Sequence, residues 1–232
     1  MEALPPQPSA PRKWYEIWWA ILRHPGKETF QSILQEPNAT YSRGFIWTAV
    51  VTLITSLVIG LASLPLIRTL PGNSSELFAN SSIFIVILVL EIIFAPLLAI
   101  AGMAIGAAIY HGIARLFGGV GQWGQLVFCL AAISAPFALL SAALNLVTAP
   151  FTMWFPSAYG SLASCCVGPF ALALGIYALV LQVIAIDAVE SIGTWKSVAT
   201  FFIPAIILVV LTICCSLTIL VPLVSSYLPN LQ

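Results

Sequence analysis

Five long stretches of the chain are almost entirely apolar, and short polar segments separate them. Each stretch is long enough to cross a hydrocarbon core ~30 Å thick, which takes a helix of ~20 residues. Backbone groups without hydrogen-bond partners are costly in lipid, so each crossing should be helical. The pattern therefore predicts an all-α fold, a polytopic membrane bundle of five transmembrane helices. These helices are expected at residues 45–66, 83–117, 125–148, 164–186 and 198–223.

The segment before the first stretch has a different pattern. Residues 1–11 are rich in proline, and we expect them to be disordered. Within residues 12–44, apolar side chains recur at three- and four-residue steps over residues 14–22, which predicts a short amphipathic helix. Pro25 ends this helix, and residues 27–34 are expected to form a second one. Neither helix is long enough to span a bilayer.

Tryptophans on the first short helix suggest where it lies, because tryptophan favours the headgroup region of a bilayer. We interpret residues 12–44 as an amphipathic, interfacial segment on the cytoplasmic side, with Trp14, Trp18 and Trp19 as anchors. The alternative is that the apolar stripe packs on other cytoplasmic parts of the same protein. The sequence alone leaves both interpretations open.

Composition supports a membrane protein and excludes several function classes. The chain is 60% hydrophobic and 7% charged, whereas about a quarter of the residues in a soluble domain are charged. Eight basic and eight acidic residues give a net charge of zero, without the basic field that nucleic-acid binding requires. The spacing of cysteines and histidines matches no metal site, and catalytic motifs are missing. We expect a lipid bilayer as the surroundings, no nucleic acid, no cofactor or metal, and no enzymatic activity.

The distribution of lysine and arginine predicts the orientation of the chain. With five crossings, seven of these eight residues fall on one side of the membrane, and only Arg68 falls on the other. The N-terminus is therefore predicted to be cytoplasmic, and the tail at residues 225–232 to be non-cytoplasmic. The seven residues are Arg12, Lys13, Arg23, Lys27, Arg43, Arg115 and Lys196.

Polar and small residues inside the apolar stretches are candidates for function or packing. Glu91 lies near the outer end of the second stretch, where a carboxylate is costly unless it is paired or hydrated. We expect it to face the bundle interior, with Asn145 as a candidate partner. The pair would be either a proton- or cation-coupled site or a hydrogen-bonded packing contact. Gly102 and Gly106 form a G-x-x-x-G face that predicts close approach of another helix.

Charged residues gather at the predicted cytoplasmic helix ends. His111 and Arg115 are four residues apart, and Asp187 and Glu190 are three apart, so each pair shares one helix face. If the two helix ends are neighbours, these residues form a cluster that Lys196 in the next loop can join. The cluster is expected to hold the cytoplasmic loops together, and the alternative is a partner-binding or pH-responsive face that uses His111.

Three segments resemble the Yip1-domain family of membrane proteins. HGIARLFGGVGQWGQLVFCLAAISAPFALL is similar to the central signature of the family, and WWAILRHPGKETF is similar to its lead-in. IYALVLQVIAIDAVESIGTWKSV is similar to its penultimate helix and the following loop. The signature residues are His111, Arg115, Gly118, Gly119 and Pro136.

The resemblance implies a five-helix transmembrane domain over residues 45–224, with a cytoplasmic N-terminus. Eukaryotic members of the family work in vesicle traffic between ER and Golgi, bind small Rab-type GTPases and self-associate. This chain lacks their long N-terminal region and the D-L-Y-G-P-type motif before the first span. It looks more like the prokaryotic branch, which implies a location in the cell membrane rather than in a Golgi membrane. A small GTPase is an expected partner only if the chain is a eukaryotic-type member.

Two functional hypotheses follow. The first is a non-enzymatic, multi-pass protein that organises or shapes membrane, or scaffolds partners, as a homo-oligomer or with other membrane proteins. The alternative is a small transporter or channel for a solute or ion, with Glu91 and the proline-kinked helices forming the pathway. The prolines in question are Pro96, Pro136, Pro169 and Pro204.

Overall fold

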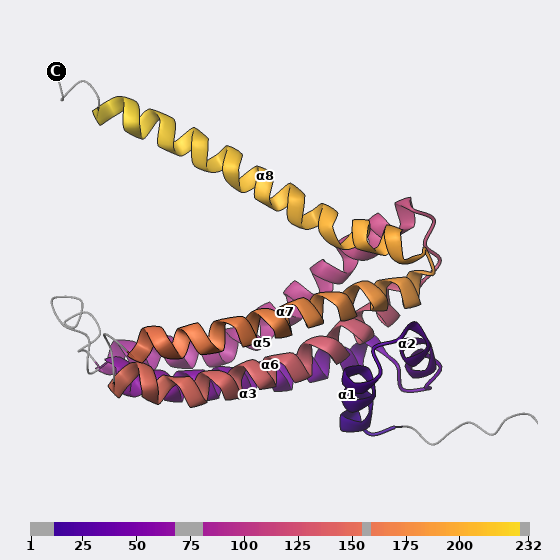
Figure 1. Ribbon diagram of the computed structural model, residues 1–232, viewed down its shortest axis with the longest axis horizontal. Coiled ribbons are helices and arrows are strands. Elements are labelled where there is room, and N and C mark those ends of the chain that lie inside the picture. Colours follow the sequence, from indigo (N-terminus) through magenta and orange to yellow (C-terminus); the bar gives the residue numbers. More distant parts are fainter. Residues whose placement is uncertain (1–11, 68–80, 155–158, 228–232) are drawn as a thin grey trace, which may run out of the picture.

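The computed structural model describes residues 12–67, 81–154 and 159–227, which form seven helices and no strand (Figure 1). Five of these helices are long and apolar enough to cross a membrane, which confirms the predicted all-α, five-span fold. Residues 1–11 and 228–232 lie outside the described residues. The helices are α1 (Trp14–Arg23), α2 (Lys27–Leu34), α3 (Tyr41–Ile67), α5 (Ser81–Leu116), α6 (Trp123–Trp154), α7 (Tyr159–Glu190) and α8 (Thr194–Tyr227).

Helix α6 is the centre of the bundle and contacts α1, α3, α5 and α7. Its first half is buried on every side from Leu126 to Ile133. A helix that is apolar all round belongs inside a protein, and small residues such as Ala131 and Ala132 let neighbouring helices approach closely. The Cα of Gly44 in α3, for example, faces Ala131 and Phe128 with almost no spare room.

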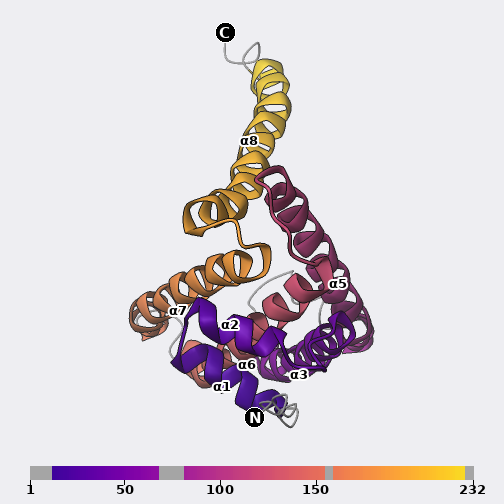
Figure 2. The same ribbon diagram turned by 90° about the vertical axis from the view of Figure 1, so that its right-hand side faces the viewer.

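Burial is concentrated at one end of the bundle. We call this the packed end; it contains α1, α2 and the α5–α6 and α7–α8 turns (Figures 1 and 2). Away from it, α5 and α8 expose apolar side chains over most of their described surface, and Figures 1 and 2 show α8 diverging from the other four long helices. The largest fully buried apolar side chains are Phe30, Phe128, Ile17, Ile21, Ile33, Leu126, Ile133, Leu181 and Ile186.

The long helices exceed the thickness of a bilayer. Helix α5 has 36 residues and α7 has 32, which correspond to about 54 Å and 48 Å, whereas a hydrocarbon core is ~30 Å thick. Each of these helices is therefore longer than a single crossing requires, by about 18 Å in α7.

Helices α1 and α2 pack their apolar stripes on the bundle. Ile17, Trp18 and Ile21 are buried, and the Trp18 ring lies edge-on to Trp47 of α3 with centroids 5.8 Å apart. The Tyr177 hydroxyl of α7 donates a hydrogen bond to the Leu22 carbonyl at 2.7 Å. The expectation that Trp18 anchors the chain in the headgroups is therefore wrong, because the bundle itself offers an apolar surface to this stripe.

Trp14 and Trp19 behave differently from Trp18. They are 51% and 64% exposed. Trp14 packs on Trp18, with ring centroids 4.7 Å apart, whereas Trp19 lies on the side of α1 opposite the buried stripe, near Tyr15. Helix α1 thus has one face for the protein and one aromatic face turned outward.

Replacing Ile21 by alanine should lower the free energy of unfolding by about 2–5 kcal/mol, because it opens a cavity under α1. Trp19→Ala, on the exposed face of the same helix, should change it by less than about 0.5 kcal/mol. Chemical denaturation in a mild detergent measures both. Equal effects of the two substitutions would show that α1 does not pack on the bundle as described.

Candidate functional site

The end of α5 is shaped by two consecutive glycines. Gly118 has a φ of +90°, the left-handed conformation that glycine adopts without a Cβ penalty. The Gly119 N–H donates to the Ala114 carbonyl at 2.8 Å and the Gly118 N–H to the Arg115 carbonyl at 3.1 Å. This is the pair of bonds of a Schellman C-cap. It ends the helix and turns the chain toward α7.

Close packing at this turn also requires glycine. A Cβ added to Gly119 would lie 2.6 Å from Glu190 Oε2, and one added to Gly121 would lie 2.5 Å from the Val189 carbonyl oxygen. The α5–α6 turn therefore rests directly on the last turn of α7. The Val120 N–H donates to the Glu190 carbonyl at 3.2 Å and joins the two segments through their backbones.

The Glu190 side chain is fully buried beneath this turn. Its Oε1 lies 2.6 Å from His111 Nδ1 of α5, and its Oε2 accepts a hydrogen bond from the Gly121 N–H at 3.1 Å. A carboxylate only accepts hydrogen bonds, so His111 Nδ1 carries the proton. One acidic side chain thus joins α5, α7 and the turn into α6.

Arg115 completes this network from the solvent side. Its Nε donates to His111 Nε2 at 3.4 Å, and its Nη2 donates to the Gly121 carbonyl at 3.0 Å. The two ring nitrogens of His111 therefore face different partners, with Nδ1 toward Glu190 and Nε2 toward Arg115. Two of the turn's backbone groups, the N–H and C=O of Gly121, are therefore held by side chains of α7 and α5.

A second carboxylate, Asp187, lies one turn earlier on α7. Its Oδ1 pairs with Lys27 Nζ of α2 at 3.1 Å and accepts from the Gly193 N–H at 2.9 Å. Its Oδ2 accepts from the Thr194 hydroxyl at 3.4 Å. Asp187 therefore fixes the start of α8 and the short helix α2 to the end of α7.

The structure brings the five predicted cluster residues to the packed end, and Lys196 joins them through a 3.3 Å hydrogen bond to the Phe117 carbonyl. Sequence reasoning missed Lys27, because no spacing rule shows that α2 packs on α7. We call this set the charged platform; its members are Lys27, His111, Arg115, Asp187, Glu190 and Lys196.

Another charge contact that the sequence did not suggest holds the start of α1. Glu36 is buried and pairs with Arg12 Nε at 3.4 Å. Arg43 Nη2 donates to the Arg12 carbonyl at 3.1 Å, and the Arg43 guanidinium lies 4.9 Å from the Trp47 ring centroid. These contacts tie the segment before α1 to the beginning of α3.

The structure does not form the predicted intramembrane site. Glu91 is exposed on α5 rather than turned into the bundle. Asn145 is also exposed, and its side-chain amide donates to the Ser141 carbonyl of its own helix at 2.9 Å. The expected interior pair is therefore wrong, because α5 buries a different face, the one with Ala107 and Ala114.

The predicted glycine contact is absent as well among the described residues. Nothing lies within 4 Å of a Cβ placed on Gly102 or Gly106. Alanine, not glycine, provides the close helix contacts of α5, at Ala107 and Ala114.

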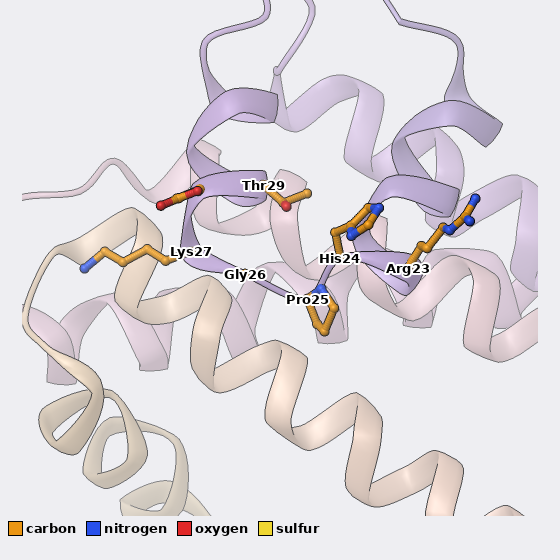
Figure 3. A pocket seen from close by; sticks show the side chains of 7 residues that line it. Arg23, His24, Pro25, Gly26, Lys27 and Thr29 are labelled. Atoms are coloured by element: carbon orange, nitrogen blue, oxygen red, sulfur yellow. The ribbon is translucent and has the colours of Figure 1, made fainter.

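A shallow hollow at the α1–α2 turn does not gather its charged groups (Figure 3). Lys27 extends to one side, where Asp187 binds it, while Arg23 and His24 point the other way. The hollow therefore has no convergent set of ligand groups. Among the residues the structure describes, no cluster of histidine, cysteine and acidic side chains could hold a metal ion.

A family model described as the Yip1 domain matches residues 19–217, which is most of the chain. The chain belongs to the Yip1-domain family. It is an integral, multi-pass membrane protein. Searches of curated proteins and of solved structures returned no match. Within this Yip1 domain, the signature residues His111, Arg115, Gly118 and Gly119 belong to one connected network at the packed end, and Pro136 lies within α6.

Replacing Glu190 by glutamine should lower the free energy of unfolding by about 1–3 kcal/mol, because it leaves a buried polar group without its hydrogen bond. The amide NH₂ would face either the Gly121 N–H or the His111 Nδ1–H, so one hydrogen bond is lost in each orientation. Glu28→Gln, at an exposed position, is the matched control and should have little effect. Denaturation in detergent that shows both variants to be equally stable would contradict the described network.

Two glycine substitutions separate packing from helix propensity. Gly121→Ala should destabilise the protein by about 1–3 kcal/mol, because its Cβ would overlap the Val189 backbone. Gly112→Ala has open space around it and should stabilise helix α5 by about 0.5–1 kcal/mol. The two changes in melting temperature should therefore have opposite signs, and the same sign for both would refute the close contact at Gly121.

Proposed function

We propose that this Yip1-domain protein is a non-enzymatic membrane organiser that shapes the bilayer and scaffolds partners through its packed end. The observation that carries the proposal is the division of the molecule: its dense core and its charged platform lie at the packed end, while the rest of the bundle exposes apolar side chains. This division supports a packed end that works as a rigid body at the membrane surface.

The basic residues support an orientation with the packed end in the cytoplasm, since lysine and arginine are enriched on that side of membranes. All seven described lysines and arginines belong to α1, α2, their flanking segments, or the packed-end termini of the long helices. This supports a cytoplasmic N-terminus, and we propose the cell membrane as the location.

The outward face of α1 supports a role at the bilayer surface. The stretch of α7 from Tyr177, which holds α1, to Glu190 rises about 20 Å, close to the length by which α7 exceeds the hydrocarbon core. Helix α1 therefore lies near the level where hydrocarbon ends, and exposed Trp14, Tyr15 and Trp19 are suited to the headgroup region. An in-plane amphipathic helix held at this level would expand one leaflet.

A transport pathway has less support. Glu91 and Asn145 are both exposed and make no hydrogen bond to each other. Transport through the bundle would need polar groups that converge at membrane depth, and these two do not.

Reconstitution of the full chain into liposomes tests this proposal. The wild-type protein should change vesicle size and shape in electron micrographs, and a Tyr15→Ser, Trp19→Ser double variant should lose most of that activity while keeping its melting temperature. Trp195→Ser, at an exposed tryptophan of α8, is the control and should remodel vesicles as the wild type does. Solute flux without remodelling, or remodelling by the double variant, would overturn the proposal.

A further inference from the structure

Three large apolar side chains are highly exposed on the turns of the packed end. Leu116, Val120 and Trp195 are 85%, 72% and 80% exposed. Leu116 ends α5, Val120 lies in the α5–α6 turn, and Trp195 lies in the first turn of α8. We call these three residues the tip patch.

The two segments that carry the tip patch are held side by side. Val120 donates its N–H to the Glu190 carbonyl at 3.2 Å, and Lys196 Nζ donates to the Phe117 carbonyl at 3.3 Å. Figures 1 and 2 show the α5–α6 and α7–α8 turns at the same end of the molecule. The patch is therefore part of a fixed surface.

The tip patch is close to the end of α7, about 20 Å along that helix from Tyr177. In the arrangement proposed above, with α1 near the membrane surface, the apolar side chains of the patch lie outside the hydrocarbon core and face water. A cluster of large apolar residues exposed to water usually marks an interaction site, and tryptophan is enriched among the residues that dominate binding energy.

Two cations flank the patch without an acidic partner. Arg115 donates to His111 and to the Gly121 carbonyl, and Lys196 donates to the Phe117 carbonyl. Neither forms an ion pair among the described residues, whereas Arg12 and Lys27 pair with Glu36 and Asp187. The carboxylate of Glu190, to which His111 joins Arg115, is fully buried and already bound by His111. The rim of the tip patch is therefore positively charged.

These observations favour one kind of occupant. A second copy of this chain would place the same cations against Arg115 and Lys196, and like charges across an interface are unfavourable. A partner with apolar side chains between acidic ones matches both features of the surface.

We propose that the tip patch binds an amphipathic helix of a partner protein. The apolar face of that helix covers Leu116, Val120 and Trp195, in the manner of a helix that docks through residues spaced three and four apart. Its glutamate or aspartate residues pair with Arg115 and Lys196. This inference rests on the scaffolding role proposed above and names the chemistry of the partner.

A pair of synthetic peptides tests the proposal on the full chain in nanodiscs of zwitterionic phosphatidylcholine. Both are fluorescent amphipathic helices with the same leucine face; one carries glutamate on its flanks and the other carries lysine. Fluorescence anisotropy should show that the glutamate peptide binds at least about tenfold more tightly. Trp195→Ser and Leu116→Ser should each weaken that binding by about tenfold or more, and Trp19→Ser should not change it.

Equal affinity for the two peptides, or binding that survives Trp195→Ser, would overturn the proposal. A photoreactive residue in place of Val120 provides a second test: labelling of the glutamate peptide supports the proposal, while labelling of lipid or of a second copy contradicts it. The remodelling assay separates the two proposals, because Trp195→Ser should abolish peptide binding without changing vesicle shape. Loss of remodelling in α1 variants leaves the peptide result unaffected.

Discussion

The arrangement of the packed end depends on the burial of one carboxylate. Glu190 has no exposed side-chain surface, and a buried charge is tolerated only when it is paired and hydrogen-bonded. His111 and the Gly121 N–H meet that requirement from two different segments. The position of Glu190 therefore sets how α5 and the turn into α6 lie against α7, and the glycines of that turn are needed for the close approach.

From this contact the rest of the packed end follows. The central helix α6 begins directly after the turn that Glu190 holds, and its first half forms the core on which α1 packs. Asp187, one turn away, adds α2 and the start of α8. The opposite halves of α5 and α8 show no such network among the described residues and expose apolar side chains. The packed end is thus the most densely packed part of the described structure.

Much of this architecture could be predicted from the sequence, since a run of apolar residues long enough to cross a bilayer has few other structures available. The meeting of His111 with Glu190 was within reach too, because connected spans alternate in direction and bring their charged ends together. The burial of Trp18 could not be predicted, because an apolar stripe has the same sequence pattern whether protein or lipid covers it. For Glu91 and Gly102, the sequence gives the depth along α5 but not which face α5 turns inward.

The central claim is that α1 is packed on the bundle as part of one rigid body at the membrane surface. Hydrogen–deuterium exchange of the full chain in nanodiscs measures this most directly. Amides of α1 around Ile17 and Ile21 should exchange as slowly as those of α6 around Phe128, and Glu190→Gln should speed exchange in both the α5–α6 turn and α6. Exchange in α1 at the rate of an unstructured peptide, with α6 still protected, would contradict the account.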